Sequence, residues 1–193
     1  SGKHYRSLWK AWQDPAFELA DQDTLTSLVP GAGAISFSMK TPEGNTITYP
    51  GAAFEGKVKI FTIMGTWCPN CRDEQNFLVA FLKENPALAD KIEVVSFAFE
   101  RYPDTAKANA QLQLYKQKMQ IPYPIVYAGK ADKKEAQKVF PALNHVLAFP
   151  TIIIIDKQNN VRHIHTGFDG PATSRYAGFK ESFTQLIRTL AAG

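Results

Sequence analysis

The chain has 193 residues, of which 45% are hydrophobic, so it can form a full core without help from disulfides. Its formal net charge is only +4, from 22 basic and 18 acidic residues with no block of like charges, which gives no support to nucleic-acid binding. No apolar run approaches the roughly 20 residues of a membrane span, so we expect no membrane insertion by this segment.

The stretch from His4 to Leu28 carries unevenly spaced aromatic and apolar side chains, which predicts a short helix at about 5–13 and then an extended arm. These side chains are expected to cover an edge of the main core. A Pro-Gly-Ala-Gly sequence at 30–33 is the best candidate for a linker. We therefore divide the chain into an N-terminal helix, arm and linker (1–33) and a main domain (34–193).

The first part of the main domain reads as a hairpin followed by a strand, a helix and a strand. Residues 35–39 and 47–49 alternate apolar and polar side chains around a Pro-Glu-Gly-Asn turn, which predicts a β-hairpin. The run 58–64 is typical of a buried strand, and apolar residues at helical spacing follow it over 71–85. The run 92–99 is continuously apolar, like a strand buried on both faces, so we expect a right-handed crossover between parallel strands.

The rest of the chain alternates between helical and extended patterns. We expect a helix at 105–120, a brief strand at 125–127, a helix at 132–140, paired strands at 151–155 and 161–166, and a C-terminal helix at about 172–191. This order predicts an α/β domain, and no repeat or low-complexity tract is visible.

The only two cysteines, Cys68 and Cys71, stand in a Cys-x-x-Cys motif between the first strand and the first helix of the main domain. The free amide groups and the dipole of a helix N-terminus stabilise a thiolate, so we expect Cys68 to be exposed and reactive. Pro69 suits the first helical position. Cys71, one turn further, can close a small ring with Cys68, and so short a loop indicates a redox couple rather than a structural crosslink.

The same spacing also occurs in zinc sites, which normally need two further ligands. The candidates would be the four histidines, His4, His145, His163 and His165. We favour thiol–disulfide exchange because the motif follows a strand and opens a helix. His163 and His165 share one face of a strand, where we expect them to lie without a ligand role. We thus expect no metal, and no cofactor beyond the redox-active disulfide itself.

The residues Gly65-Thr66-Trp67-Cys68-Pro69-Asn70-Cys71-Arg72-Asp73-Glu74 resemble the G-x-W-C-x-x-C-x-x-E motif of the TlpA and ResA type of thiol-disulfide reductases, extracytoplasmic thioredoxin-like proteins of bacteria. The run Phe149-Pro150-Thr151 resembles their cis-proline region, and the resemblance extends from about Ile35 to the C-terminus. It implies a thioredoxin-like fold, with a central mixed sheet flanked by helices, to which this chain adds an N-terminal β-hairpin and an N-terminal arm.

The resemblance also implies roles for individual residues. Cys68 would be the attacking thiolate and Cys71 the resolving thiol, with a cis Pro150 facing them. A cis bond turns the backbone of Phe149 outward, where it can pair with an extended substrate segment. An aromatic ring beside the motif, Trp67, is either a flat platform for substrate, which we favour because the turn should be exposed, or a core residue. The candidate substrate-binding residues are Trp67, Pro69, Phe149 and Pro150.

Two acidic residues are candidates for proton transfer. Glu74 lies three residues beyond Cys71 on the same helical face, so its carboxylate can take the proton of the resolving thiol; the alternative is that it only stabilises the helix dipole. Glu100 ends the buried strand at the edge where ligands collect in open α/β sheets, and members of the family carry an acidic residue nearby. Thr62 stands where cytosolic thioredoxins have a buried Asp, so proton transfer is expected to rely on Glu74, Glu100 or water.

The sequence therefore predicts a protein-disulfide reductase that acts outside the cytoplasm. Its expected partners are a disulfide-bonded protein substrate and an upstream thiol electron donor, for which a membrane reductase is one candidate. The alternatives are a thioredoxin-fold binding or chaperone module and a disulfide oxidase or isomerase, which the reduction potential would distinguish. A peroxidase would need a lone reactive cysteine in a different setting. Because the chain begins with Ser1, we expect any signal peptide or anchor to be absent from it.

Overall fold

The fold comes from a computed structural model that describes residues 21–102 and 104–193; the helix expected at 5–13 lies outside these residues. The strands are β1 (Phe37–Lys40), β2 (Thr46–Tyr49), β3 (Val58–Met64), β4 (Ile92–Glu100), β5 (Ile125–Lys130), β6 (Thr151–Ile155) and β7 (Val161–Thr166). The helices are η1 (Ala52–Phe54), α2 (Pro69–Glu84), α3 (Pro86–Ala89), α4 (Thr105–Lys118), α5 (Lys133–Val139) and α6 (Tyr176–Ala192).

The central sheet has five strands in the order β5-β4-β3-β6-β7, and β1 and β2 form a separate hairpin. β3, β4 and β5 run parallel, whereas β6 is antiparallel to both β3 and β7. The sheet is therefore mixed, as expected. The C-terminal ends of β3 and β4 meet the N-terminal end of β6 at one edge, because Ile63 pairs with Thr151 and Met64 with Ala98.

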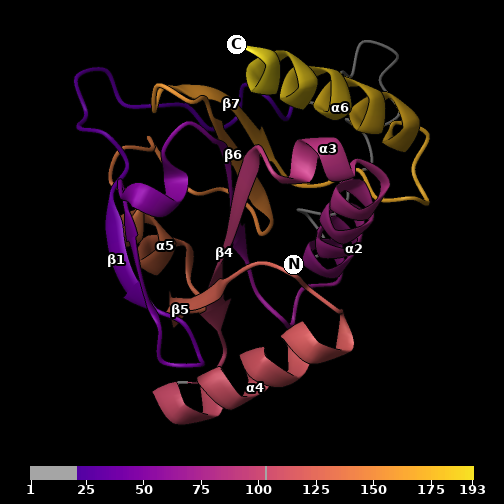
Figure 1. Ribbon diagram of the computed structural model, residues 1–193. Coiled ribbons are helices and arrows are strands. Elements are labelled where there is room, and N and C mark those ends of the chain that lie inside the picture. The colour runs from indigo at the N-terminus through magenta and orange to yellow at the C-terminus, as the bar shows by residue number, and fades with distance from the viewer. Residues whose placement is uncertain (1–20, 103) are drawn as a thin grey trace, which may run out of the picture.

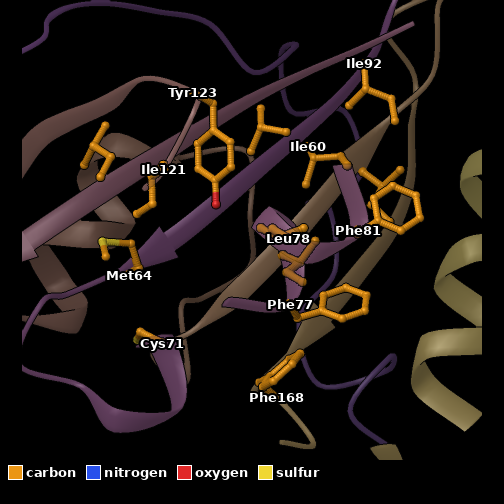
Figure 2. Close-up of a cluster of buried hydrophobic side chains, with 14 of the residues drawn as sticks. Ile60, Met64, Cys71, Phe77, Leu78, Phe81, Ile92, Ile121, Tyr123 and Phe168 are labelled. Atoms are coloured by element: carbon orange, nitrogen blue, oxygen red, sulfur yellow. The ribbon is translucent and has the colours of Figure 1, made fainter. Parts of the chain in front are cut away.

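Both faces of the sheet are covered, which is why its strands are apolar on both sides. Helices α2, α4 and α6 pack on one face, and the hairpin, η1 and α5 pack on the other (Figure 1). On the α2 face, Phe77 and Phe81 of the helix contact Phe183 of α6, with ring centroids 5.0 and 5.1 Å apart. Figure 2 shows this core cluster, with Cys71 at its lower left and Ile92 at its upper right. Cys71 thus belongs to the hydrophobic core as well as to the Cys-x-x-Cys motif.

Residues 21–29 of the arm lie against the domain. The Thr166 amide of β7 donates to the Gln22 carbonyl, and the Val29 amide donates to the Ala142 carbonyl. Leu28 forms an isolated bridge with Leu143. The arm therefore covers part of the edge strand β7, whose backbone groups would otherwise be open to other chains.

Most expected elements are confirmed, and the differences are at their ends. α6 begins at Tyr176 rather than near 172, because Thr173 turns back onto the Gly170 carbonyl through both its amide and its hydroxyl. β5 continues to Lys130 beyond the expected end at 127, because it keeps pairing with β4 across a bulge and passes through Gly129 at φ +145°. Among the described helices, none is long and apolar enough to cross a membrane.

Candidate active site

The Cys-x-x-Cys motif lies at the junction of β3 and α2, at the end of the sheet where β3 and β4 finish and β6 begins. Cys68 is the N-cap of α2, Pro69 follows it at the start of the helix, and the Cys71 amide donates to the Cys68 sulfur over 3.3 Å. The chain turns here because Cys68 has extended backbone angles while the residues after it are helical. The predicted placement of a thiol at a helix N-terminus is confirmed. Both cysteines are free thiols in this structure.

Cys68 is less exposed than expected. Its accessible fraction is only 6%, and that of Cys71 is 0%. The reason is the neighbouring turn before β6: the Cys68 sulfur donates to the Phe149 carbonyl over 3.4 Å. The bond from Phe149 to Pro150 is cis, as predicted from the sequence, and a second cis bond that we did not expect joins Tyr49 to Pro50.

The two thiols have opposite electrostatic environments. The pKa of Cys68 is lowered to about 7, chiefly by a hydrogen bond from the Cys71 thiol and also by the amides of Cys71 and Asn70. Burial is the main cause that raises the pKa of Cys71 above its ordinary value, and the hydrogen bond to Cys68 and the charge of Glu74 add to it. Near neutral pH, Cys68 therefore ionises far more readily than Cys71, which keeps its proton.

Glu74 is fully buried beneath the dithiol. Burial raises its pKa well above the ordinary value, because a carboxylate without water is costly. One of its oxygens, Oε2, accepts a hydrogen bond from the Gln75 side chain at 3.3 Å, and the other, Oε1, has no hydrogen-bond partner among the described residues. A carboxyl group in this position can hold or release a proton near Cys71, as the sequence suggested.

A buried polar network that sequence reasoning missed connects α2 to the sheet. The Gln75 amide donates to the Thr62 hydroxyl of β3 (3.1 Å), Thr62 donates to Ser96 of β4 (3.2 Å), and Ser96 donates back to the Gln75 carbonyl oxygen (3.0 Å). The Tyr123 hydroxyl also donates to that oxygen at 2.9 Å. Gln75 lies four residues from Cys71 on the core-facing side of the helix, and this spacing was the available signal.

Glu100 lies at the end of β4, as expected, but it binds the motif turn rather than a thiol. Its carboxylate accepts from the Thr66 amide at 2.8 Å and from the Thr66 hydroxyl at 2.7 Å. Burial raises its pKa, although these hydrogen bonds act in the opposite direction. The structure therefore gives Glu100 a role in fixing the backbone two residues before Cys68.

Trp67 is half-buried and held from three sides. Its Nε1 donates to the Phe99 carbonyl at 2.9 Å, its ring meets Phe149 edge-on at 5.6 Å, and the Arg101 guanidinium lies 4.6 Å from a ring centre. Gly65 permits this arrangement, because a Cβ there would lie 2.8 Å from the Phe99 carbonyl oxygen. Pro69, by contrast, is exposed beside the motif. The ring is thus part of the scaffold, and its free area is smaller than that of an open platform.

Within the described residues, the one group of three metal-ligating side chains contains no cysteine. It consists of Asp23, His163 and His165, whose ligand atoms lie within 4.8 Å of one another. The predicted sharing of one strand face by the two histidines is confirmed, since their rings stack at 6.3 Å. The zinc alternative for the Cys-x-x-Cys motif therefore finds no histidine beside it in the described part of the chain.

A mixed sheet with α2 following β3, a dithiol at the start of that helix and a cis-proline opposite it define a thioredoxin-like protein. Comparison with known families agrees with this class: the model of the AhpC/TSA family matches residues 30–164. The chain belongs to the AhpC/TSA family.

Three individual relatives share 18–28% sequence identity with this chain. The chain is 28% identical over 137 residues to the thioredoxin-like protein YneN of Bacillus subtilis, a match that covers 71% of each chain. A secreted thiol-disulfide isomerase from Corynebacterium glutamicum superposes with a TM-score of 0.65 at 18% identity, covering 92% of this chain and 99% of that one. A putative thiol:disulfide interchange protein DsbE from Chlorobium tepidum gives 0.62 at 18% identity, covering 86% and 99%. These structures establish the fold.

Proposed function

We propose that this protein is a thiol-disulfide oxidoreductase that reduces disulfide bonds of other proteins through Cys68 and Cys71. One observation carries the proposal: the two sulfurs have opposite environments, with a thiol of pKa about 7 at the start of α2 and a buried thiol of raised pKa one turn behind it. Exchange through a mixed disulfide needs this asymmetry, because one thiol must attack the substrate while the other stays protonated until the mixed disulfide has formed.

The reaction proceeds in two exchanges. The Cys68 thiolate attacks one sulfur of the substrate disulfide, a mixed disulfide forms, and the other substrate sulfur leaves as a thiolate that takes up a proton from solvent. Cys71 then loses its proton and attacks the Cys68 sulfur, which forms the Cys68–Cys71 disulfide and releases the second substrate thiol. The substrate gains two electrons and two protons in total, and an external dithiol must later reduce the protein again.

The second exchange needs a base near Cys71, because burial keeps the pKa of that thiol high. Glu74 fits this role in its deprotonated form: it is buried in the same helix, and its Oε1 is free of other partners among the described residues. Glu100 is less suited, since both of its oxygens are occupied by Thr66. We therefore assign proton acceptance to Glu74 and positioning of the motif turn to Glu100.

Substrate would bind beside the Phe149–Pro150 turn. The Phe149 carbonyl already faces the Cys68 sulfur, so a peptide backbone placed along this turn would bring its own sulfur close to the thiolate. Phe149 is half-buried, Pro69 is exposed and Trp67 packs against Phe149, so these side chains would form the walls of the contact.

Reduction rather than oxidation is favoured by the acidity of Cys68. A strong disulfide oxidant has a much more stabilised thiolate, with a pKa of about 3.5, whereas a pKa of about 7 is typical of a reductant such as thioredoxin. The resemblance to TlpA and ResA, and the structural similarity to a secreted thiol-disulfide isomerase, support a site of action outside the cytoplasm. The partners would be disulfide-bonded proteins and an upstream thiol donor, for which a membrane reductase is a candidate.

The proposal is tested by a redox titration against glutathione combined with an insulin-reduction assay. We expect turbidity from reduced insulin and a potential more negative than about −220 mV, the range of cellular reductants. A potential near −120 mV would identify an oxidase instead. A binding or chaperone module would not reduce insulin, and its binding of other proteins would be unchanged in Cys68→Ala.

A further inference from the structure

His163 and His165 lie side by side on the edge strand β7, on the face that α6 covers. They pair in register with Ile154 and Ile152 of β6, which belong to the core beneath α6. The His165 ring contacts Phe179 of α6 with centroids 4.8 Å apart. In Figure 1 the yellow α6 lies along the top of the view, next to β7.

The two rings face one carboxylate oxygen from a distant part of the chain. His163 Nε2 lies 3.2 Å and His165 Nδ1 lies 2.6 Å from the same atom, Asp23 Oδ1. The arm that carries Asp23 is held beside them by backbone pairing of Gln22 with Thr166 and by a hydroxyl hydrogen bond from Thr166 to Thr26 (2.7 Å). Three donor groups from two segments thus converge on one point.

His165 is incompletely satisfied by hydrogen bonds. Its side chain is only 8% exposed, and its Nε2 has no hydrogen-bond partner among the described residues. A buried imidazole that uses only one of its two nitrogens is unusual for a purely structural residue, because such groups are normally paired by protein or water. Its other nitrogen, Nδ1, is the one that faces Asp23, so Nδ1 is the atom available to a further group at the cluster.

We propose that Asp23, His163 and His165 bind a divalent transition-metal ion of the zinc type. Bonds of about 2.0–2.1 Å in tetrahedral geometry place neighbouring ligand atoms about 3.3 Å apart. The separation of 3.2 Å between His163 and Asp23 already meets this value, and the 2.6 Å separation of His165 from Asp23 would have to open by about 0.7 Å. Asp23 is 46% exposed, so a side-chain rotation suffices.

The surroundings favour a cation of this kind. The cavity between the arm, β7 and α6 is lined by the carboxylates Asp21, Asp23 and Asp169 and by one guanidinium, Arg175, which is paired with Asp169 at 2.9 Å. Two imidazoles and one carboxylate suit zinc, copper or nickel better than magnesium or calcium, which prefer oxygen ligands. Three protein ligands leave a fourth position to water from the open side of the cavity. This departs from the expectation that the two histidines have no ligand role.

The bound ion would fasten the arm to the edge strand. Asp23 belongs to the arm, and the Gly167 amide that follows β7 donates to the Pro150 carbonyl beside the dithiol. The metal would therefore fix the arm near the substrate turn without taking part in the exchange chemistry.

The test is calorimetric titration with zinc chloride of the full chain carrying Cys68→Ser and Cys71→Ser, which removes the thiols as competing ligands. We expect one ion per chain, at least tenfold weaker binding in His163→Gln and in Asp23→Asn, and at most threefold weaker binding in the matched control His145→Gln. Asp23→Asn keeps an oxygen that accepts from His165, so it separates a metal ligand from a mere hydrogen-bond acceptor. Magnesium chloride should give no comparable heat.

Absence of zinc binding, or binding that is unchanged in both site variants, would overturn the proposal. Circular dichroism confirms that each variant is folded before titration. A rise in melting temperature with zinc, present in the thiol-free parent and lost in His163→Gln, is the second expected readout. Because the parent lacks both thiols, neither result depends on the proposed reductase activity.

Discussion

Replacing Cys71 with alanine should raise the pKa of Cys68, whereas replacing it with serine should raise it much less. The largest influence that lowers the pKa of Cys68 to about 7 is the hydrogen bond from the Cys71 thiol. Alanine removes this donor, and serine keeps an O–H group in its place. The amide of residue 71 donates to the Cys68 sulfur in all three proteins, so it cancels from the comparison.

The size of the effect follows from the strength of that hydrogen bond. A hydrogen bond to a charged group is worth about 1.5–3 kcal/mol, and about 1.4 kcal/mol changes a pKa by one, so Cys68 in Cys71→Ala should titrate about 1 to 2 pH units higher. At pH 6 this lowers the thiolate fraction about 10- to 90-fold. The remaining thiolate is more nucleophilic, with a Brønsted coefficient of about 0.4–0.5, so the net reaction should slow about 3- to 15-fold.

The assay is the rate of iodoacetamide alkylation of Cys68 between about pH 5 and pH 10, followed by mass spectrometry. Above both pKa values, near pH 10, the alanine variant should react at least as fast as the serine variant, which separates an effect on ionisation from an effect on access. If the two variants titrate within about 0.3 pH units of each other, the Cys71 thiol does not supply the stabilising hydrogen bond and the reasoning fails.

Three further outcomes are expected. Cys71→Ser should accumulate mixed disulfides with a disulfide-bonded protein on non-reducing electrophoresis and Cys68→Ser should not, because only Cys68 attacks; trapping by Cys68→Ser alone would reverse the roles. Glu74→Gln should be more stable than the parent at pH 8 but not at pH 4, since the raised pKa of Glu74 costs the parent up to about 1.4 kcal/mol per pH unit as pH rises above the ordinary value of 4.5; urea unfolding that shows the same difference at both pH values would contradict this. Gln75→Leu should lose about 2–4 kcal/mol in urea unfolding because it leaves the buried Tyr123 hydroxyl unpaired and takes one hydrogen bond each from Thr62 and Ser96, and a loss below about 0.5 kcal/mol would show that the network relaxes freely.

The parts of the site that could be predicted from the sequence are those determined by neighbouring residues. The turn at Cys68 follows from an apolar strand, a proline at the first helical position and helical spacing afterwards, and all three signals lie within one stretch of chain. The cis bond at Pro150 was predicted from the resemblance of Phe149-Pro150-Thr151 to a known cis-proline region. Each of these predictions needs no knowledge of how distant segments meet.

The parts that could not be predicted depend on contacts between distant segments. The network at Gln75 requires the register of β3 against β4, which places Thr62 opposite Ser96. The low exposure of Cys68 requires the turn at Phe149 to lie against it, and the approach of Asp23 to His165 joins residues that are 142 positions apart. Hydrophobic patterns place strands in a sheet, but they do not state which polar side chains will face one another across it.

The closed network beneath the dithiol also constrains how this family can change over evolution. A single replacement of Thr62, Gln75 or Ser96 takes one hydrogen bond from each of its buried partners, whereas replacing all three by apolar residues of similar shape, together with Tyr123 by phenylalanine, can be nearly neutral. Proteins in which only one or two of these polar residues have been replaced are the least stable forms. We therefore expect these three positions and position 123 to covary among relatives, switching together between a polar set and an apolar set rather than changing one at a time.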